Sequence, residues 1–177
     1  GKSINAFTNN ENTTSQTNNL TVAGALTVAA SKTLTITTVT LTNSNSSEVS
    51  WGNGSSTISG TGTLIFPNGS GGPGTSGVVS SITRFDATNG DIASTTFDAR
   101  TYSGRVELYN NSATSRTTTF AAGTYTTSGS TSHIYLLANA SGDMPVDGQT
   151  NSPTVTDAGH LKFTGTGSGT EVLSMGD

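Results

Sequence analysis

The sequence predicts an all-β protein, with an antiparallel β-sandwich or jelly-roll-like domain in its C-terminal part and a strand-rich region before it. In residues 20–42, apolar side chains alternate with Thr or small residues, which is the period of two of a pleated strand. Thr, Ser, Gly and Asn together make up more than half of the 177 residues, and only 10% are charged. Disordered chains usually carry more charge, and the branched Cβ of Thr suits a strand, so this composition favours an ordered sheet with a polar face.

The chain divides into four predicted parts. Residues 1–19 are rich in Asn and Thr, and we expect a flexible arm or a strand exchanged with another subunit. Residues 20–66 are predicted to form an N-terminal β region, either a short β-solenoid or a donor strand. Residues 67–77 contain two prolines and five glycines, which exclude a regular element and predict a linker or a surface loop. Residues 78–177 contain eight short alternating runs separated by turn residues, a pattern typical of a sandwich.

The apolar residues of the segment 20–42 form pairs spaced two apart. In an extended chain they lie on one face, and they need an apolar groove on their own sheet or on a neighbour's. We therefore predict that this segment is an assembly strand. Its alternating apolar residues are Leu20, Val22, Leu26, Val28, Leu34, Ile36, Val39 and Leu41.

No catalytic site is predicted, and we expect a protein that is not an enzyme. The chain has two histidines, His133 and His160, and no cysteine, and it contains no metalloprotease, Walker or nucleophile-elbow motif. A net charge of −4 with scattered Lys and Arg argues against nucleic-acid binding, which needs clustered positive charge. No apolar run reaches the roughly 20 residues needed for a membrane span.

One loop is a candidate metal site. Asp86, Asn89 and Asp91 surround a glycine in the run DATNGD, and carboxylate and amide oxygens are the ligands that Ca²⁺ prefers. The run lacks the last Glu of an EF-hand loop, and a simple Asx turn explains the same residues. Calcium at this loop is the single cofactor candidate.

The sequence also contains seven Asn-X-Ser/Thr sequons, which are acceptors for glycosylation if the source glycosylates its surface proteins. They begin at Asn12, Asn19, Asn45, Asn53, Asn68, Asn110 and Asn139.

Two runs carry a resemblance to known proteins. Residues 19–28 (NLTVAGALTV) and 56–65 (STISGTGTLI) resemble the rungs of bacterial secreted β-rich proteins, namely autotransporter passengers and large surface adhesins. The resemblance implies a location outside the cell or at its surface and no catalytic residues. The thin-cored β region is also similar to the subunits of filaments built by donor-strand exchange, in which the N-terminal strand of one subunit completes the sheet of the next.

These observations predict a structural subunit of an extracellular, pilus-like filament or of a cell-surface layer, assembled by β-strand addition between copies of the chain. The alternative is a monomeric adhesin or carbohydrate-binding module that binds surface glycans. That alternative predicts a binding patch around Trp51 and the acidic loops.

Overall fold

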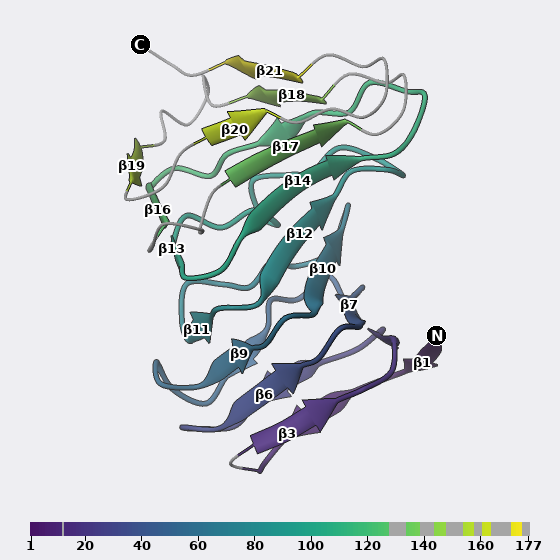
Figure 1. Cartoon of the computed structure of the whole chain (residues 1–177), viewed down its shortest axis with the longest axis vertical. Helices are drawn as coiled ribbons and strands as arrows, with labels where there is room; N and C mark the ends of the chain where they lie inside the picture. Colours follow the sequence, from purple (N-terminus) through teal and green to yellow (C-terminus); the bar gives the residue numbers. More distant parts are fainter. Residues whose placement is uncertain are drawn as a thin grey trace.

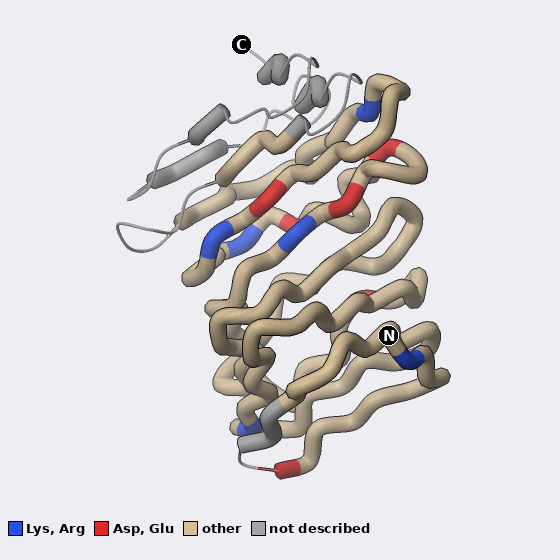
Figure 2. Tube along the Cα trace, turned by 45° about the vertical axis from the view of Figure 1, so that its right-hand side comes forward, with Lys and Arg blue, Asp and Glu red and all other residues tan. Residues whose placement is uncertain are grey.

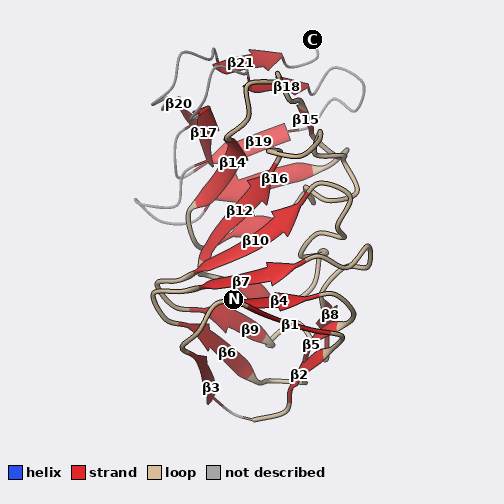
Figure 3. Cartoon of the chain, turned by 90° about the vertical axis from the view of Figure 1, so that its right-hand side faces the viewer, coloured by secondary structure: helices blue, strands red, loops and turns tan. Residues whose placement is uncertain are grey.

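The described residues form a β-solenoid, in which the chain winds through successive coils of two or three short strands. The computed structural model describes residues 1–11, 13–127, 134–138, 144–147, 154–157, 161–163 and 171–174. Within these ranges the structure contains strands, turns and bends and no helix (Figure 3). The strands stack along the long axis of the molecule, from β3 (Thr13–Gln16) near one end to β21 (Glu171–Ser174) at the other (Figure 1).

The first strand of each coil contributes to a single eight-stranded sheet. Its strands follow one another in chain order, so each coil adds one strand beside the previous one. They are β1 (Lys2–Ile4), β4 (Leu20–Val22), β7 (Thr40–Asn43), β10 (Thr63–Pro67), β12 (Ile82–Asp86), β14 (Val106–Asn110), β17 (Ile134–Ala138) and β20 (Leu161–Phe163).

Smaller sheets form the other two sides of the coil. The second side contains β2 (Phe7–Asn9), β5 (Leu26–Val28) and β8 (Ser50–Trp51), and later β15 (Thr118–Thr119), β18 (Met144–Asp147) and β21. The third side contains β3, β6 (Thr33–Ile36), β9 (Thr57–Ser59) and β11 (Val78–Val79), and later β13 (Thr101–Tyr102), β16 (Thr124–Thr127) and β19 (Thr154–Asp157).

All the strand pairs among the described residues are parallel. The predicted antiparallel sandwich or jelly roll over residues 78–177 is therefore wrong. Alternation of apolar and polar residues shows that a strand buries one face, but it does not determine the direction of the neighbouring strand. The solenoid considered for residues 20–66 is instead the architecture of the whole described part.

The coils differ in length, which hides the repeat in the sequence. Paired residues are 18 positions apart between Lys2 and Leu20, 23 apart between Thr83 and Val106, and 28 apart between Val106 and Ile134. Loops at the corners absorb the difference, while the strand register continues. A fixed period of the kind that identifies regular repeat proteins is therefore absent.

The core changes character along the axis. Aliphatic side chains such as Leu34 and Ile36 fill the N-terminal coils, whereas aromatic rings fill the later ones. Phe97 lies at the centre of the aromatic part, and its ring centroid is 4.7 Å from those of Phe85 and Tyr125 and 4.9 Å from that of Phe120. Contacts of this kind add to the free energy gained by burying the rings.

The predicted assembly strand lies in the chain's own interior. Leu20 and Val39 are partly buried and pack against the core. The other six residues are at most 1% exposed, and they are Val22, Leu26, Val28, Leu34, Ile36 and Leu41. Seven of the eight residues lie in strands and Val39 lies in a bend between β6 and β7, and the sheets that cover them belong to the same chain.

The glycine-rich segment 67–77 is a loop inside the solenoid, and residues 70–74 of it are buried. β10 before the segment and β12 after it are neighbours in the eight-stranded sheet, so the same sheet continues across it. The Trp51 indole N–H donates a hydrogen bond of 2.7 Å to the Pro73 carbonyl. Gly77 has a φ of +67°, and a Cβ there would lie 2.2 Å from the Trp51 ring, so this close approach requires glycine.

Candidate functional site

The outer face of the eight-stranded sheet carries a network of charged and aromatic side chains. The register places Arg84 of β12 beside Glu107 of β14, and Glu107 beside Tyr135 of β17. Arg105 directly precedes β14. Figure 2 shows that Lys, Arg, Asp and Glu gather in the middle coils, while the N-terminal coils carry few of them.

Two arginines share the carboxylate of Glu107. Arg84 donates from Nε to Oε2 over 2.7 Å and from Nη2 to the same oxygen over 2.6 Å, and Arg105 Nη2 lies 2.9 Å from Oε1. The Glu107 side chain is 5% exposed, whereas those of Arg84 and Arg105 are 28% and 39% exposed. One negative charge therefore lies beneath two positive ones, which leaves a net positive charge at the surface.

Tyrosine rings fix the position of both guanidinium groups. The Arg84 Cζ lies 4.2 Å from the ring centroid of Tyr109, and the Arg105 Cζ lies 4.1 Å from that of Tyr135. A guanidinium group over an aromatic face is attracted by the ring's quadrupole. The ion pairs and the rings together hold the two arginines in defined orientations.

A groove of about 410 Å³ adjoins this network, at the corner where the third side of the coil turns into the eight-stranded sheet. It is lined by Gly60, Thr61, Ser80, Ile82, Ser103, Gly104, Arg105 and Tyr135. These residues come from successive coils, so the groove follows the stacking direction of the coils. Gly60 has a φ of +105°, which few other residues tolerate.

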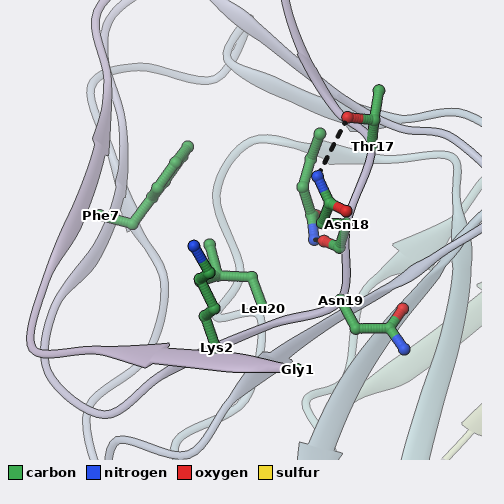
Figure 4. Close-up of a pocket in the computed structure, with 8 residues that line it drawn as sticks. Gly1, Lys2, Phe7, Thr17, Asn18, Asn19 and Leu20 are labelled. Carbon is green, nitrogen blue, oxygen red and sulfur yellow. Dashed lines mark hydrogen bonds between the residues drawn. The ribbon is translucent and has the colours of Figure 1, made fainter.

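A second hollow, of about 680 Å³, lies at the N-terminal end of the solenoid (Figure 4). Lys2, Phe7 and Leu20 surround it in the figure, together with the segment 16–19. Phe7 and Leu20 are partly buried apolar side chains that pack against the core. The lining of this hollow is therefore partly apolar.

A buried ionic cluster holds the glycine-rich loop. Asp98 Oδ2 accepts a hydrogen bond of 2.7 Å from the Gly74 N–H. Arg100 Nη1 donates to the Gly74 carbonyl over 2.8 Å, and its Nη2 donates to the Gly77 carbonyl over 2.7 Å. Asp98 and Arg100 are 8% and 7% exposed. Their charged groups are therefore shielded from solvent and interact with the loop backbone.

Burial raises the pKa of Asp98 from 3.8 to about 6. The hydrogen bond from Gly74 and the charge of Arg100 lower this pKa, whereas the nearby Glu48 raises it further. Since the folded state binds this proton more tightly than the unfolded state, the stabilisation is present below pH 3.8 and lost as the pH rises through 6. Acidification from pH 7 to pH 4 is expected to gain on the order of 1–3 kcal/mol from this group.

Asp98→Asn is expected to remove this gain, because the amide oxygen still accepts from Gly74 and carries no charge. The measurement is urea denaturation of both proteins at several pH values, and the difference between them isolates Asp98 from other acidic groups. Parallel pH profiles for the two proteins would contradict the assignment.

Both carboxylates of the calcium candidate accept hydrogen bonds from backbone N–H groups. Asp86 Oδ1 accepts from the Thr88 N–H over 2.9 Å within its own turn, and Asp91 Oδ1 accepts from the Thr117 N–H over 2.9 Å in the next coil. Asn89 is exposed. Among the described residues, no three His, Cys, Asp or Glu side chains gather closely enough to hold a metal ion. Calcium at this loop stays a prediction.

The sequons lie in different surroundings. Asn19 and Asn53 are exposed, and Asn45 and Asn68 are half-buried. Asn110 is fully buried and donates a hydrogen bond of 3.0 Å to the Thr114 carbonyl, so it is not an accessible acceptor in the folded chain. Asn12 and Asn139, like both histidines, lie outside the described residues.

Sequence reasoning missed the network of Arg84, Arg105, Glu107, Tyr109 and Tyr135. These residues come from three coils, and the unequal coil lengths conceal that they share a ladder. The available signal was local: VELY and IYLL are the most apolar runs of the C-terminal half, and each carries a Tyr on its outward side. Aligning these two runs as neighbouring strands would have placed Glu107 beside Tyr135.

The described residues contain no helix that is long and apolar enough to cross a membrane. No protein-family model matches the chain, and neither a curated protein nor a solved structure matches it significantly.

Proposed function

We propose that this protein is a structural subunit of an extracellular filament or cell-surface layer, in which copies join end to end by β-strand addition. The observation that carries the proposal is that β1, β2 and β3 each pair with another described strand on one side only. A sheet edge with unpaired N–H and C=O groups is a template for pairing with another chain. The low charge and the hydroxyl-rich surface support a location outside the cell.

The backbone groups at this edge can be assigned individually. Phe7 donates its N–H to Ala25 over 2.9 Å, and the Asn9 carbonyl accepts from Ala29 over 2.9 Å, so both residues pair with the second coil. Backbone groups alternate in direction along a strand, so those of Thr8 point away from that coil and toward the open edge. In β1, Lys2 and Ile4 pair with the second coil, so the backbone groups of Ser3 between them also point toward the open edge.

At the opposite end, the last described coil contributes β20 and β21, and the third side ends one coil earlier at β19. Among the described residues, β20, β21 and β19 are the last strands of the three sides, and each pairs on one side only. All strands run parallel, so the last coil of one copy can continue into the first coil of the next. Such a head-to-tail contact does not close on itself and forms an open fibre.

This mechanism differs from the donor strand suggested by residues 20–42. Those apolar side chains fill the chain's own core. Inserting them into a groove of a neighbouring copy would remove them from that core. In the proposed contact, the affinity comes from main-chain hydrogen bonds and from covering the hollow beside Phe7 and Leu20.

Thr8→Pro tests the proposal, because it removes one outward N–H without breaking a hydrogen bond inside the coil. We expect it to abolish concentration-dependent assembly, measured by sedimentation velocity and electron microscopy, and to leave the melting temperature unchanged. The matched control is Thr8→Val, which keeps the N–H and should still assemble. Assembly of Thr8→Pro equal to that of the wild type would contradict the proposal.

The second candidate function, a monomeric adhesin or carbohydrate-binding module, is favoured by the groove beside Arg105 and Tyr135. The patch expected around Trp51 does not support it, because that indole is hydrogen-bonded to the glycine-rich loop. A wild-type chain that stays monomeric at all concentrations would favour this second function over assembly.

A further inference from the structure

We propose that the groove beside the Arg84–Glu107–Arg105 network binds an acidic polysaccharide, with Arg105 contacting a uronate carboxylate. The site is independent of end-to-end assembly, because it lies on the side of the solenoid and not at an end. The groove, the charge of its rim and the hydroxyl groups along it support this ligand class.

Charge favours an anion at this position. The chain as a whole carries a net charge of −4, yet the network places two partly exposed arginines over a single buried carboxylate. An anionic ligand is therefore favoured at this position over the rest of the chain, which carries the excess of negative charge. A guanidinium group offers donors in a planar fork, which matches a carboxylate better than a point charge does.

The arginines are held in place before a ligand arrives. Glu107 binds both of them, and the rings of Tyr109 and Tyr135 lie against their guanidinium planes. Pairing with both arginines offsets the cost of burying the Glu107 carboxylate, and the same contacts orient the two guanidinium groups. Groups that are already oriented lose less entropy on binding, which raises affinity.

The shape of the groove favours a long ligand over a compact one. Thr61, Ser80 and Ser103 are exposed and come from three successive corners of the solenoid. Adjacent parallel strands are about 4.8 Å apart, so the groove offers a hydroxyl-bearing residue at each step along the axis. A sugar chain lying along the axis can contact these residues in succession while one of its carboxylates reaches Arg105.

The test measures binding of a short oligogalacturonate to the full chain by isothermal titration calorimetry, with a neutral maltodextrin of equal length as the comparison ligand. We expect the acidic oligomer to bind, the neutral one to bind at least tenfold more weakly, and added salt to reduce the affinity. Arg105→Gln is expected to weaken binding of the acidic oligomer at least tenfold.

Two further variants distinguish binding in the groove from attraction by the overall charge of the protein. Arg116→Gln removes the same charge from a half-buried arginine outside the groove, and it should bind like the wild type. Ser80→Tyr keeps the charge and fills the groove at an exposed position, and it should weaken binding. No binding of the acidic oligomer, equal binding of the neutral one, or equal losses in Arg105→Gln and Arg116→Gln would overturn the proposal.

Discussion

Phe97→Ala is expected to lower the free energy of unfolding by about 3–5 kcal/mol, the range for removing a buried aromatic ring. Phe97 is fully buried, and its ring contacts Phe85 of its own coil and Phe120 and Tyr125 of the next coil. The coils are covalently linked and stacked, so the rings cannot easily collapse into the cavity that the substitution leaves. The cost should therefore lie toward the upper part of the range.

Denaturant unfolding followed by circular dichroism measures this change. Val78→Ala is the matched control, because Val78 is 37% exposed and should lose less than about 0.5 kcal/mol. An effect of Phe97→Ala no larger than that of the control would show that the aromatic rings do not form the centre of the core.

Arg100→Met is expected to cost about 3–5 kcal/mol, because it removes a buried guanidinium group that donates charged hydrogen bonds and attracts the Asp98 carboxylate. It also leaves the carbonyl groups of Gly74 and Gly77 without the guanidinium donors that they have now. Burial lowers the pKa of Arg100, which reflects the cost of keeping its charge inside. The methionine preserves the apolar stem, so the effect reports the lost charge and hydrogen bonds.

Limited proteolysis separates this effect from global loss of stability. Arg100→Met should expose the segment 70–77 to cleavage at denaturant concentrations that leave the eight-stranded sheet folded. Arg100→Met combined with Asp98→Asn should recover part of the stability, because the unpaired carboxylate is then gone. Arg116→Met serves as the control, and resistance of the loop equal to that in this control would contradict the role of Arg100.

The local pattern of the sequence was enough to predict extended structure and its buried face. Leu34 and Ile36, two apart in a Thr-rich run, are both fully buried, as period two requires. The same pattern could not predict strand direction. Phe66 and Phe85 stack at 5.6 Å as register partners in parallel strands, and nothing in either run distinguishes this from an antiparallel pair.

The candidate site was harder to predict because it depends on long-range register. Glu107 meets Arg84 from the preceding coil and Arg105 from its own, and Tyr135 follows a coil of a different length. The acidic loop at Asp86 and Asp91 stood out in the sequence because its residues are neighbours in the chain. In the fold, those carboxylates cap backbone N–H groups of two different coils.

Distances between spin labels test the parallel solenoid most directly, and the absence of native cysteine makes pairwise labelling straightforward. Thr21, Thr42, Ile65 and Arg84 occupy successive positions on one ladder of the eight-stranded sheet. The backbone separation from Thr21 should increase by about 4.8 Å at each step, to roughly 5, 10 and 14 Å. A label at Arg84 as close to Thr21 as one at Thr42, or distances that do not follow chain order, would contradict the solenoid.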